Sequence, residues 1–421
     1  MKSESDLKIE KLLKKGVKIP NPESIEIGPE VDTNRISGDG VVIYSGCKIF
    51  GRSMLILQGS ILGYEGPVTI ESCQIGPHVE LKGGFFRNAV FLKKSSMGSG
   101  ANVREGTILE EESRESSGAH TVGLKQTILF PYVTLGSLIN FCDCLMSGGT
   151  SRKNHSEVGS SYIHFNYTPN QDKATPSLIG DVPRGVMLNQ HPIFLGGQGG
   201  LVGPCRLEFG TVIAAGSILR KDELRPERLL FGSIGKVGNI PFLRGKYFNI
   251  KRITMNNIIY IANLIALEHW YTHVRSQFLS DDFPEPLFDG LKEKLDMAIA
   301  ERIHRFKALS QKMSDSVRNY QYHAKEKENE FRLVLQQKKE LYKRWNELEE
   351  TFKSQRNIEE KKRLRDIFLE KIDSGIKTSG KDYILVIKGL SIEDKNGGTG
   401  WLQGIVNSII AEALKIMPSF T

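Results

Sequence analysis

The chain has 421 residues, a length that allows two or three domains. Hydrophobic residues make up 39% and charged residues 25% of the sequence, so the chain can bury a large core, which excludes a disordered protein. The net charge of +8, from 57 basic and 49 acidic residues, is not concentrated in one tail. We therefore expect no nucleic-acid partner.

The cysteine content and the start of the chain predict a cytoplasmic protein. Five cysteines form an odd set, and no apolar run follows Met1. The longest apolar stretch, residues 258–267, is too short to span a bilayer and ends in Glu268 and His269. We expect reduced cysteines and no transmembrane segment.

The first expected element is a short amphipathic helix. Between residues 4 and 15, Leu7, Ile9 and Leu12 recur among lysines. From about Ile25 the pattern changes to short β-branched clusters punctuated by glycine, and 34 of the 42 glycines precede residue 251. The first half of the chain is therefore predicted to be poor in helix.

A six-residue period runs through this glycine-rich part. The repeating positions are Leu195, Leu201, Leu207, Ile213 and Leu219, with looser runs at Ile43, Ile49, Leu55 and Ile61 and at Val133, Ile139 and Leu145. A strand alternates every two residues and a helix every three to four, so a period of six requires a chain that turns a corner after each hexad. Three such faces make one coil of a triangular prism with the aliphatic side chains inside. The alternative is a sandwich of unrelated short strands, which five hexads in one register disfavour.

The size of the prism follows from this repeat. About 200 residues at about 18 per turn give roughly 11 coils and a length of roughly 50 Å. Each coil contacts only its neighbours, so the ends of the prism need caps. The N-terminal helix and the later helical region are the expected caps.

After Arg252 the pattern is helical. Residues 256–279 carry a one-sided apolar stripe, and residues 287–313 follow a proline-rich turn. Residues 325–352 are highly charged with a sparse apolar stripe, which is typical of a helical hairpin or a coiled-coil arm. The tail is predicted to contain a strand at residues 383–387, a glycine turn at residues 397–398 and a docking helix at residues 401–416.

These patterns divide the chain into five parts. They are an N-terminal capping helix (1–24), a β-helix (25–237), a linker (238–255), a helical domain (256–375) and a strand-and-helix tail (376–421). The fold class is therefore mainly β plus α, with a parallel β-helix followed by an α-helical domain that carries a coiled-coil-like arm.

Several short motifs between residues 140 and 236 carry a family resemblance. They are Asn140-Phe141, Asn154-His155, Asn166-Tyr167 followed by Lys173, Ile179-Gly180-Asp181, Leu201-Val202-Gly203-Pro204, Ile213-Ala214-Ala215-Gly216 and Gly232-Ser233-Ile234-Gly235-Lys236. In this order they resemble the acetyltransferase half of the bifunctional uridyltransferase/acetyltransferase that makes UDP-N-acetylglucosamine, a hexapeptide-repeat enzyme built as a left-handed parallel β-helix. The resemblance implies an acyltransferase that uses acetyl-CoA or another acyl-CoA, acts on an amino sugar, sugar phosphate or sugar nucleotide, and forms a homotrimer.

Acyl transfer from a thioester needs a base that takes a proton from the acceptor. The resemblance gives this role to His155. His164 is a second candidate, because it lies two residues before Asn166 and would face the same side of a strand. The resemblance also implies acceptor contacts at Asn140, Asn166 and Tyr167, and Lys173 could pair with the acceptor phosphate.

Further candidates are less specific. His191 lies in a segment, residues 182–192, that interrupts the period and is expected to project as a loop. The resemblance implies coenzyme A contacts that match Ser160, Gly197 and Ala215, with Lys236 near a nucleotide phosphate. Small residues at the corners of a β-helix are also what the fold itself requires, and a histidine in a turn is usually solvated or capping.

The chain also departs from the family pattern. His155 precedes Asn166 by only 11 residues, about two hexads fewer than in the family, and Cys142, Asp143 and Cys144 stand where the family has a lysine. The glycine-rich loop of a uridyltransferase is absent before Ile25, so we expect no nucleotidyl transfer. Cys142 and Cys144 lack a second pair at metal-binding spacing, so no metal is expected.

Two hypotheses follow from the sequence. The first is a cytoplasmic, trimeric, coenzyme A-dependent acyltransferase that acts on a sugar or sugar nucleotide with His155 or His164 as base. The second is a non-catalytic β-helix that binds a sugar nucleotide or acts as a scaffold, with a protein partner docked on its helical arm.

Overall fold

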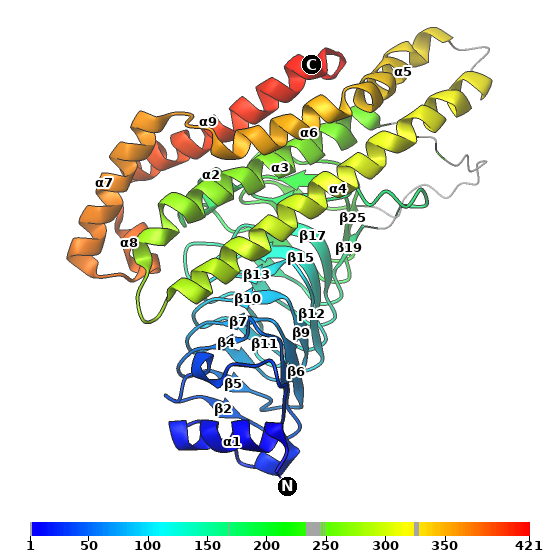
Figure 1. Ribbon diagram of the computed structural model, residues 1–421. Coiled ribbons are helices and arrows are strands. Elements are labelled where there is room, and N and C mark those ends of the chain that lie inside the picture. The colour runs from blue at the N-terminus through cyan, green and yellow to red at the C-terminus, as the bar shows by residue number, and fades with distance from the viewer. Residues whose placement is uncertain (1, 167, 233–244, 246, 248, 324–327) are drawn as a thin grey trace.

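The computed structural model describes the chain except residues 1, 167, 233–244, 246, 248 and 324–327. The first half forms a parallel β-solenoid and the second half forms a layer of helices packed along its side (Figure 1). The predicted combination of a parallel β-helix and an α-helical region is therefore confirmed. Among the described helices, none combines the length and the apolar character needed to cross a membrane.

The solenoid has three parallel faces, which we name after their first strands. The β2 face contains β2 (Val42–Ile43), β5 (Ile61–Leu62), β8 (Glu80–Leu81), β11 (Ser96–Met97), β14 (Arg114–Glu115), β16 (Thr134–Leu135), β18 (Glu157–Val158), β21 (Phe194–Leu195), β24 (Val212–Ile213) and β26 (Leu229–Leu230). Each strand pairs in parallel with its equivalent in the next turn, so the ten strands of this face mark ten successive turns.

The other two faces form one continuous sheet, because two long strands bend across the corner between them. The β1 face contains β1 (Glu26–Ile27), β3 (Lys48–Phe50), β6 (Val68–Glu71), β9 (Gly84–Arg87), β12 (Ala101–Val103), β19 (Ile163–Phe165), β22 (Gly200–Val202) and β25 (Ile218–Leu219). The β4 face contains β4 (Leu55–Ile56), β7 (Gln74–Ile75), β10 (Ala89–Phe91), β13 (Thr107–Leu109), β20 (Ser177–Ile179) and β23 (Cys205–Leu207). The bent strands β15 (Gly123–Leu129) and β17 (Asn140–Met146) contribute to both faces.

The hexad period predicts the late coils well. Leu195, Leu201, Leu207 and Ile213 lie on successive faces and are buried in the prism interior, and Leu219 packs against them. The interior is thus filled by one aliphatic side chain per face and turn, as the period requires.

The same period was wrong for some early and middle positions. Leu55 and Leu145 belong to the core between the solenoid and the helices, whereas Ile56 and Met146, one residue later, point into the prism. A shift of one residue moves a side chain to the opposite face of a strand. The chain is apolar at both positions, so the period alone did not distinguish inside from outside.

The N-terminal helix α1 (Glu4–Lys15) closes the first coil, as predicted. Ser3 and Asp6 form a capping box at its start, and Gly16 ends it with a left-handed backbone at φ 107°. Ile9 and Leu12 are buried in the prism core, so the helix covers the apolar end of the solenoid.

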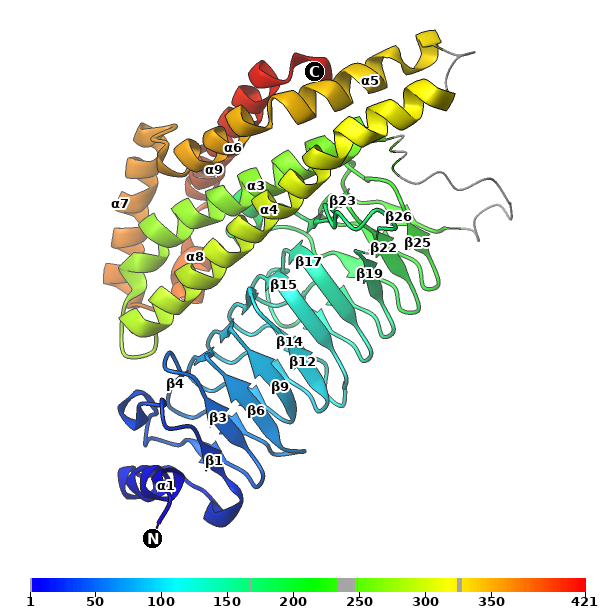
Figure 2. The same cartoon turned by 45° about the vertical axis from the view of Figure 1, so that its right-hand side comes forward.

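The helical layer covers the β4 face rather than the open end of the prism (Figure 2). Its helices are α2 (Val182–Gly185), α3 (Ile250–His273), α4 (Glu285–His323), α5 (Glu328–Lys343), α6 (Trp345–Ser354), α7 (Lys362–Ser379), α8 (Tyr383–Gly389) and α9 (Ile392–Ile416). Helix α4 packs on β7, β10 and β13, and α3 packs on β20. The later helices pack chiefly on α3, on α4 and on one another.

The β4 face accepts these helices because its outward side is apolar. Val90, Ile108, Ile128, Leu145 and Leu178 pair in register from turn to turn and are all buried against the helices. Strands that are buried on both sides are expected to be continuously apolar. At the start of this row, Gly290 of α4 lies next to Gln74. A Cβ at this position would be 2.5 Å from the Gln74 side-chain amide oxygen, so the glycine lets α4 approach the sheet closely.

Three expectations about the chain outside the regular coils were wrong. Residues 383–387 form part of helix α8 and not a strand, because Asp382 caps the helix by accepting a hydrogen bond from the Leu385 amide. The glycines at 397–398 lie inside helix α9 and not in a turn. Residues 182–192 do not project as a loop, because Val182, Val186, Met187 and Leu188 are buried against the helical layer. Between β18 and β21 this insertion roughly doubles the usual length of a turn.

The predicted charged arm is divided into two helices. Helix α5 lies beside α4, as expected for a helical hairpin, and α6 follows after Arg344. Leu341 and Trp345 of the proposed apolar stripe are buried, but Leu333 is exposed.

One carboxyl group lies inside the solenoid. Glu115 on β14 occupies an inward position next to Leu135, and both of its carboxyl oxygens are buried. Burial raises the pKa of Glu115 to about 8. The native state therefore holds a proton on Glu115 that the unfolded chain releases near pH 4.5.

This placement predicts that Glu115 destabilises the protein increasingly as the pH rises from about 4.5 to about 8. Relative to the unsubstituted protein, we expect Glu115→Gln to gain roughly 4 kcal/mol in free energy of unfolding between pH 5 and pH 8.5, because each unit of pKa difference corresponds to about 1.36 kcal/mol. Urea unfolding at both pH values measures this difference. The control is Glu80→Gln on the exposed side of β8; an equal pH dependence in both variants would contradict the prediction.

Candidate functional site

The structure distributes the predicted site residues over three corners of the prism. Ser160, Gly197 and Ala215 lie at the corner between the β2 and β1 faces. Asn166 and Lys173 lie at the corner between the β1 and β4 faces, in the connection between β19 and β20. His155 and His191 lie at the corner between the β4 and β2 faces, just before β18 and β21. One chain therefore does not bring these groups together.

Ser160, Gly197 and Ala215 form a row along one corner. The Gln198 amide donates a hydrogen bond to the Ser160 carbonyl, and the Gly216 amide donates one to the Gly197 carbonyl. Ser160 and Ala215 are exposed, and Gly197 is half-buried. At Gly197 a Cβ would lie 2.8 Å from the Ser160 carbonyl oxygen. The row presents small residues and backbone, which permits close approach of a long flexible ligand.

A surface groove of about 550 Å³ adjoins this corner on the β1 face. Asn140, the first residue of β17, lines the groove and is exposed. Leu138 also lines the groove. The residue before it, Ser137, donates a hydrogen bond from its backbone amide to the Ser160 hydroxyl. The groove and the row of small residues are thus continuous along the surface.

Two cations missed by the sequence analysis line the groove. Lys125 pairs in register with Cys142, and the Arg104 amide donates a hydrogen bond to the carbonyl of Leu124, the residue before Lys125. A lysine therefore stands one turn away from the position where the family lysine is absent. The sequence could have indicated this neighbour, because Lys125 precedes Cys142 by about the length of one coil.

The charge beside the groove is positive. Glu105 contacts Lys125 at 2.8 Å, Arg87 at 3.4 Å and Arg104 at 3.6 Å. Burial would raise the pKa of Glu105, but the hydrogen bond from Lys125 and the charges of Lys125 and Arg104 outweigh burial and hold the pKa at about 2. One carboxylate thus faces three cations, and this excess favours an anionic ligand.

Asn166 rests on a buried ion pair between the two halves of the molecule. Its side-chain amide donates a hydrogen bond to Asp143 at 3.4 Å, and Arg302 of α4 contacts the other oxygen of Asp143 at 2.7 Å. The side chains of Arg302 and Asp143 are only 2% and 7% exposed. The helical layer therefore fixes the corner from which Asn166 projects.

His164 is an interior residue. Its Nδ1 contacts the Cys142 carbonyl, so Nδ1 must donate, and its Nε2 accepts from the Ser177 hydroxyl at 2.8 Å. Burial lowers the pKa of His164 to about 4, although the nearby Asp143 acts to raise it. Both ring nitrogens are occupied and the residue is 3% exposed, so it does not face the groove.

His155 is accessible and lies next to a carboxylate. Its Nδ1 contacts the Arg152 carbonyl at 2.9 Å, which fixes Nδ1 as the donor. Its Nε2 lies 3.3 Å from the Glu157 carboxylate. An accessible imidazole nitrogen beside a carboxylate is an arrangement suited to a general base.

The remaining predicted residues have less defined surroundings. His191 is 76% exposed and lies 3.2 Å from Glu227. Lys173 is exposed with a left-handed backbone at φ 54°. Tyr167 and Lys236 lie outside the described residues.

All five cysteines are free thiols. Burial, with the neighbouring Asp143, raises the pKa of Cys142 to about 11. In the part of the chain that the structure describes, no group of three or more His, Cys, Asp or Glu side chains is placed to hold a metal ion.

Comparison with known proteins gives relatives that match about half of the chain. The protein named bifunctional protein GlmU from Thermotoga maritima is 27% identical over 216 residues, which is 51% of this chain and 42% of the relative. The GlmU proteins of Nitratidesulfovibrio vulgaris and Lawsonia intracellularis are 26% and 30% identical over 227 and 232 residues. About half of this chain is GlmU-like in sequence. The resemblance to the hexapeptide-repeat acyltransferases is therefore confirmed.

The GlmU-like match has a limited extent. This chain spans less than half the length of the curated relatives that it matches. No protein-family model matches the chain.

The ion pair beneath the GlmU-like corner predicts a large stability effect. Arg302→Met would leave Asp143 buried without its partner, and we expect the free energy of unfolding to fall by about 3–5 kcal/mol. Arg305→Met on the same helix removes a partly exposed pair with Glu301 and should cost less than about 1 kcal/mol. Denaturant unfolding of both variants measures the difference. An equal decrease in the free energy of unfolding in the two variants would contradict a larger contribution from the buried pair.

Proposed function

We propose that the protein is a coenzyme A-dependent acyltransferase, most simply an acetyltransferase, that acts on a phosphorylated amino sugar or a sugar nucleotide. The observation that carries the proposal is the continuity between the row of small residues at Ser160, Gly197 and Ala215 and the cationic groove at Asn140. A pantetheine arm needs a surface of small residues, and a sugar phosphate needs cations beside hydrogen-bonding side chains. The family resemblance supports the same pair of ligands.

In the proposed reaction, the acceptor amine attacks the thioester carbonyl. A bond forms between nitrogen and carbon, the carbon–sulfur bond breaks, and the thiolate leaves as the thiol after it takes a proton. His155 is the proposed base, because its Nε2 is accessible and faces Glu157. His164 is less suited to this step, because its pKa is low and its nitrogens are occupied.

The proposed site combines residues from different chains. His155, Asn166 and Ser160 lie at three different corners, so a complete site requires corners of neighbouring protomers to meet. A trimer, which the resemblance implies, would bring different corners of adjacent prisms together. The helical layer leaves the β1 and β2 faces open for such contacts.

The direct test is thiol release from acetyl-CoA with glucosamine 1-phosphate and a panel of other amino sugars and sugar nucleotides. We expect turnover with at least one acceptor and a decrease in kcat of about 100-fold or more in His155→Asn. His78→Asn, at an exposed corner with a left-handed backbone that asparagine tolerates, is the control. Absence of turnover with every acceptor, together with absence of coenzyme A binding by calorimetry, would refute the proposal.

The groove predicts a separate effect on acceptor binding. Lys125→Ala combined with Arg104→Ala should weaken binding of glucosamine 1-phosphate by about tenfold or more and change binding of glucosamine little, because only the former carries phosphate. Lys48→Ala, at the far end of the β1 face, is the control. Isothermal titration calorimetry checks the ratio, and equal effects on both sugars would exclude a phosphate contact.

A non-catalytic scaffold is the second candidate function. The separation of His155 from Asn166 and the interior position of His164 favour it, because a single chain holds no complete catalytic cluster. A scaffold would bind the sugar phosphate in the groove without thiol release. Binding without turnover by the purified oligomer would therefore support this candidate over the enzyme.

A further inference from the structure

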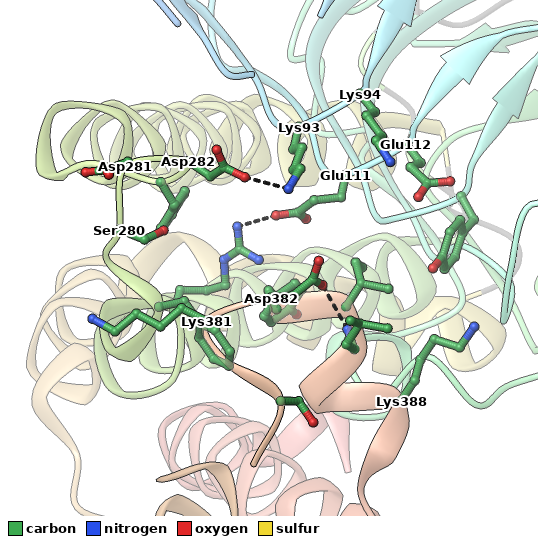
Figure 3. A pocket seen from close by; sticks show the side chains of 18 residues that line it. Lys93, Lys94, Glu111, Glu112, Ser280, Asp281, Asp282, Lys381, Asp382 and Lys388 are labelled. Atoms are coloured by element: carbon green, nitrogen blue, oxygen red, sulfur yellow. Dashed lines mark hydrogen bonds and ion pairs between the residues drawn. The ribbon is translucent and has the colours of Figure 1, made fainter. Parts of the chain in front are cut away.

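A second cavity, distinct from the groove, lies between the solenoid and the helical layer (Figure 3). Its volume is about 760 Å³, within the range of small-molecule sites. Three successive turns contribute to it at the corner between the β4 and β2 faces, and the helical layer contributes the segments 275–283 and 379–388. The GlmU-like groove lies on the β1 face, so the two sites are separate.

The inner wall of the cavity is aromatic and rigid. The Arg275 guanidinium lies 3.8 Å from the centre of the Tyr383 ring and 4.5 Å from that of Phe283. Glu111 fixes the guanidinium through a contact of 2.6 Å, and the Arg275 side chain is 1% exposed. Tyr132 and Phe278 extend the aromatic surface. The Arg275 guanidinium already covers these two ring faces and the groups of this wall are at most 8% exposed, so a flat ligand would lie against the edge of the wall.

This wall retains unused hydrogen-bonding groups. Within the described structure, one carboxyl oxygen of Glu111 and the Nε and Nη1 groups of Arg275 have no hydrogen-bond partner. Buried donors and acceptors without partners are costly. A ligand that carries both donors and acceptors along a flat edge would suit a wall of this composition.

The rim carries cations from three separate elements. Lys94 projects from a solenoid corner, Lys381 precedes α8 and Lys388 lies near the end of α8. Within the described chain, none of the three forms an ion pair with a carboxylate, whereas Lys93 of the same cavity pairs with Asp282 at 2.6 Å. Lys94 and Lys388 are exposed and lie on the same side of the cavity as Glu112 in the view of Figure 3.

Carboxylates also line the cavity, which limits the class of ligand. Glu112, Asp281 and Asp382 would repel a simple polyanion. Carboxylates accept hydrogen bonds from hydroxyl groups, whereas ammonium groups bind phosphate. The ligand should therefore combine a planar hydrogen-bonding part, hydroxyl groups and a separate phosphate.

We propose that this cavity binds a nucleoside phosphate, with the base against the edge of the aromatic wall, the ribose hydroxyls toward Glu112 and the phosphates between Lys94 and Lys388. The site would connect the solenoid with the helical layer, because its walls come from both. Occupation of the cavity would stabilise their packing, since the ligand binds only when both walls are present.

The test uses the full-length protein and equilibrium titration with ADP and UDP, with adenosine, uridine and pyrophosphate as partial ligands. We expect a nucleoside diphosphate to bind at least about tenfold more tightly than its nucleoside or pyrophosphate alone. The double variant Lys94→Glu/Lys388→Glu should lose about tenfold or more in affinity. Lys339→Glu, an exposed position on α5, is the matched charge control and should retain the affinity.

A further variant separates this cavity from the proposed coenzyme A row, because coenzyme A also contains a nucleoside phosphate. Ala215→Glu should leave ADP and UDP binding unchanged while it obstructs the row at the β2/β1 corner. Failure of both diphosphates to bind at about 1 mM would overturn the inference. Binding that survives Lys94→Glu/Lys388→Glu but is lost in Ala215→Glu would also overturn it, and would place the nucleotide in the solenoid row.

Discussion

The burial of one aliphatic side chain per face and turn inside the prism is the constraint on which the rest of the structure depends. Leu195, Leu201, Leu207 and Ile213 pack in this way on successive faces. Their packing holds equivalent strands in parallel register, so outward residues of successive turns are also aligned. Surface rows such as Lys125 beside Cys142 are consequences of this alignment. Residues that are one coil apart in the sequence thus become neighbours on adjacent turns of the solenoid.

A second apolar row, on the outside of the β4 face, decides how the helical half is attached. The outward side of that face is apolar at Ile108, Ile128 and Leu145. Helices α3 and α4 remove it from solvent. The buried pair between Arg302 and Asp143 adds a polar contact at the same boundary. Removing one partner of such a pair leaves an uncompensated buried charge, which is strongly destabilising. The apolar row and this pair together attach the helices to the β4 face.

The candidate site could be predicted only in part from the sequence. The family resemblance, and not a local pattern, pointed to the row at Ser160, Gly197 and Ala215 and to the groove residue Asn140. The two groove cations, Arg104 and Lys125, were missed, since they lie before the motif segment and become neighbours only through the coil. The candidate base His164 lies in the interior, which alternation along a strand could not reveal without knowledge of which residues of β19 face inward.

The second half shows why apolar patterns mislead. Residues 383–387 form a short continuous apolar run, which fits a strand or a buried helix equally, and the cap at Asp382 decides for the helix. Gly398 suggested a turn, but it lies in α9 where a Cβ would be 2.6 Å from Met187 and Phe368. The glycine is required by close packing between helices and not by a change of chain direction. Such contacts join residues that are distant in the sequence.

The sequence by itself determined that the first half winds into a three-faced solenoid and that the second half is largely helical. Both features follow from local periods, since a hexad or a helical stripe is set by neighbouring residues. Only the tertiary structure decided which face the helices cover, which corner each site residue occupies and which aliphatic residues point outward. These depend on the accumulated number of residues per turn, including the insertion before β21, and on contacts across more than 100 residues, such as Arg302 with Asp143.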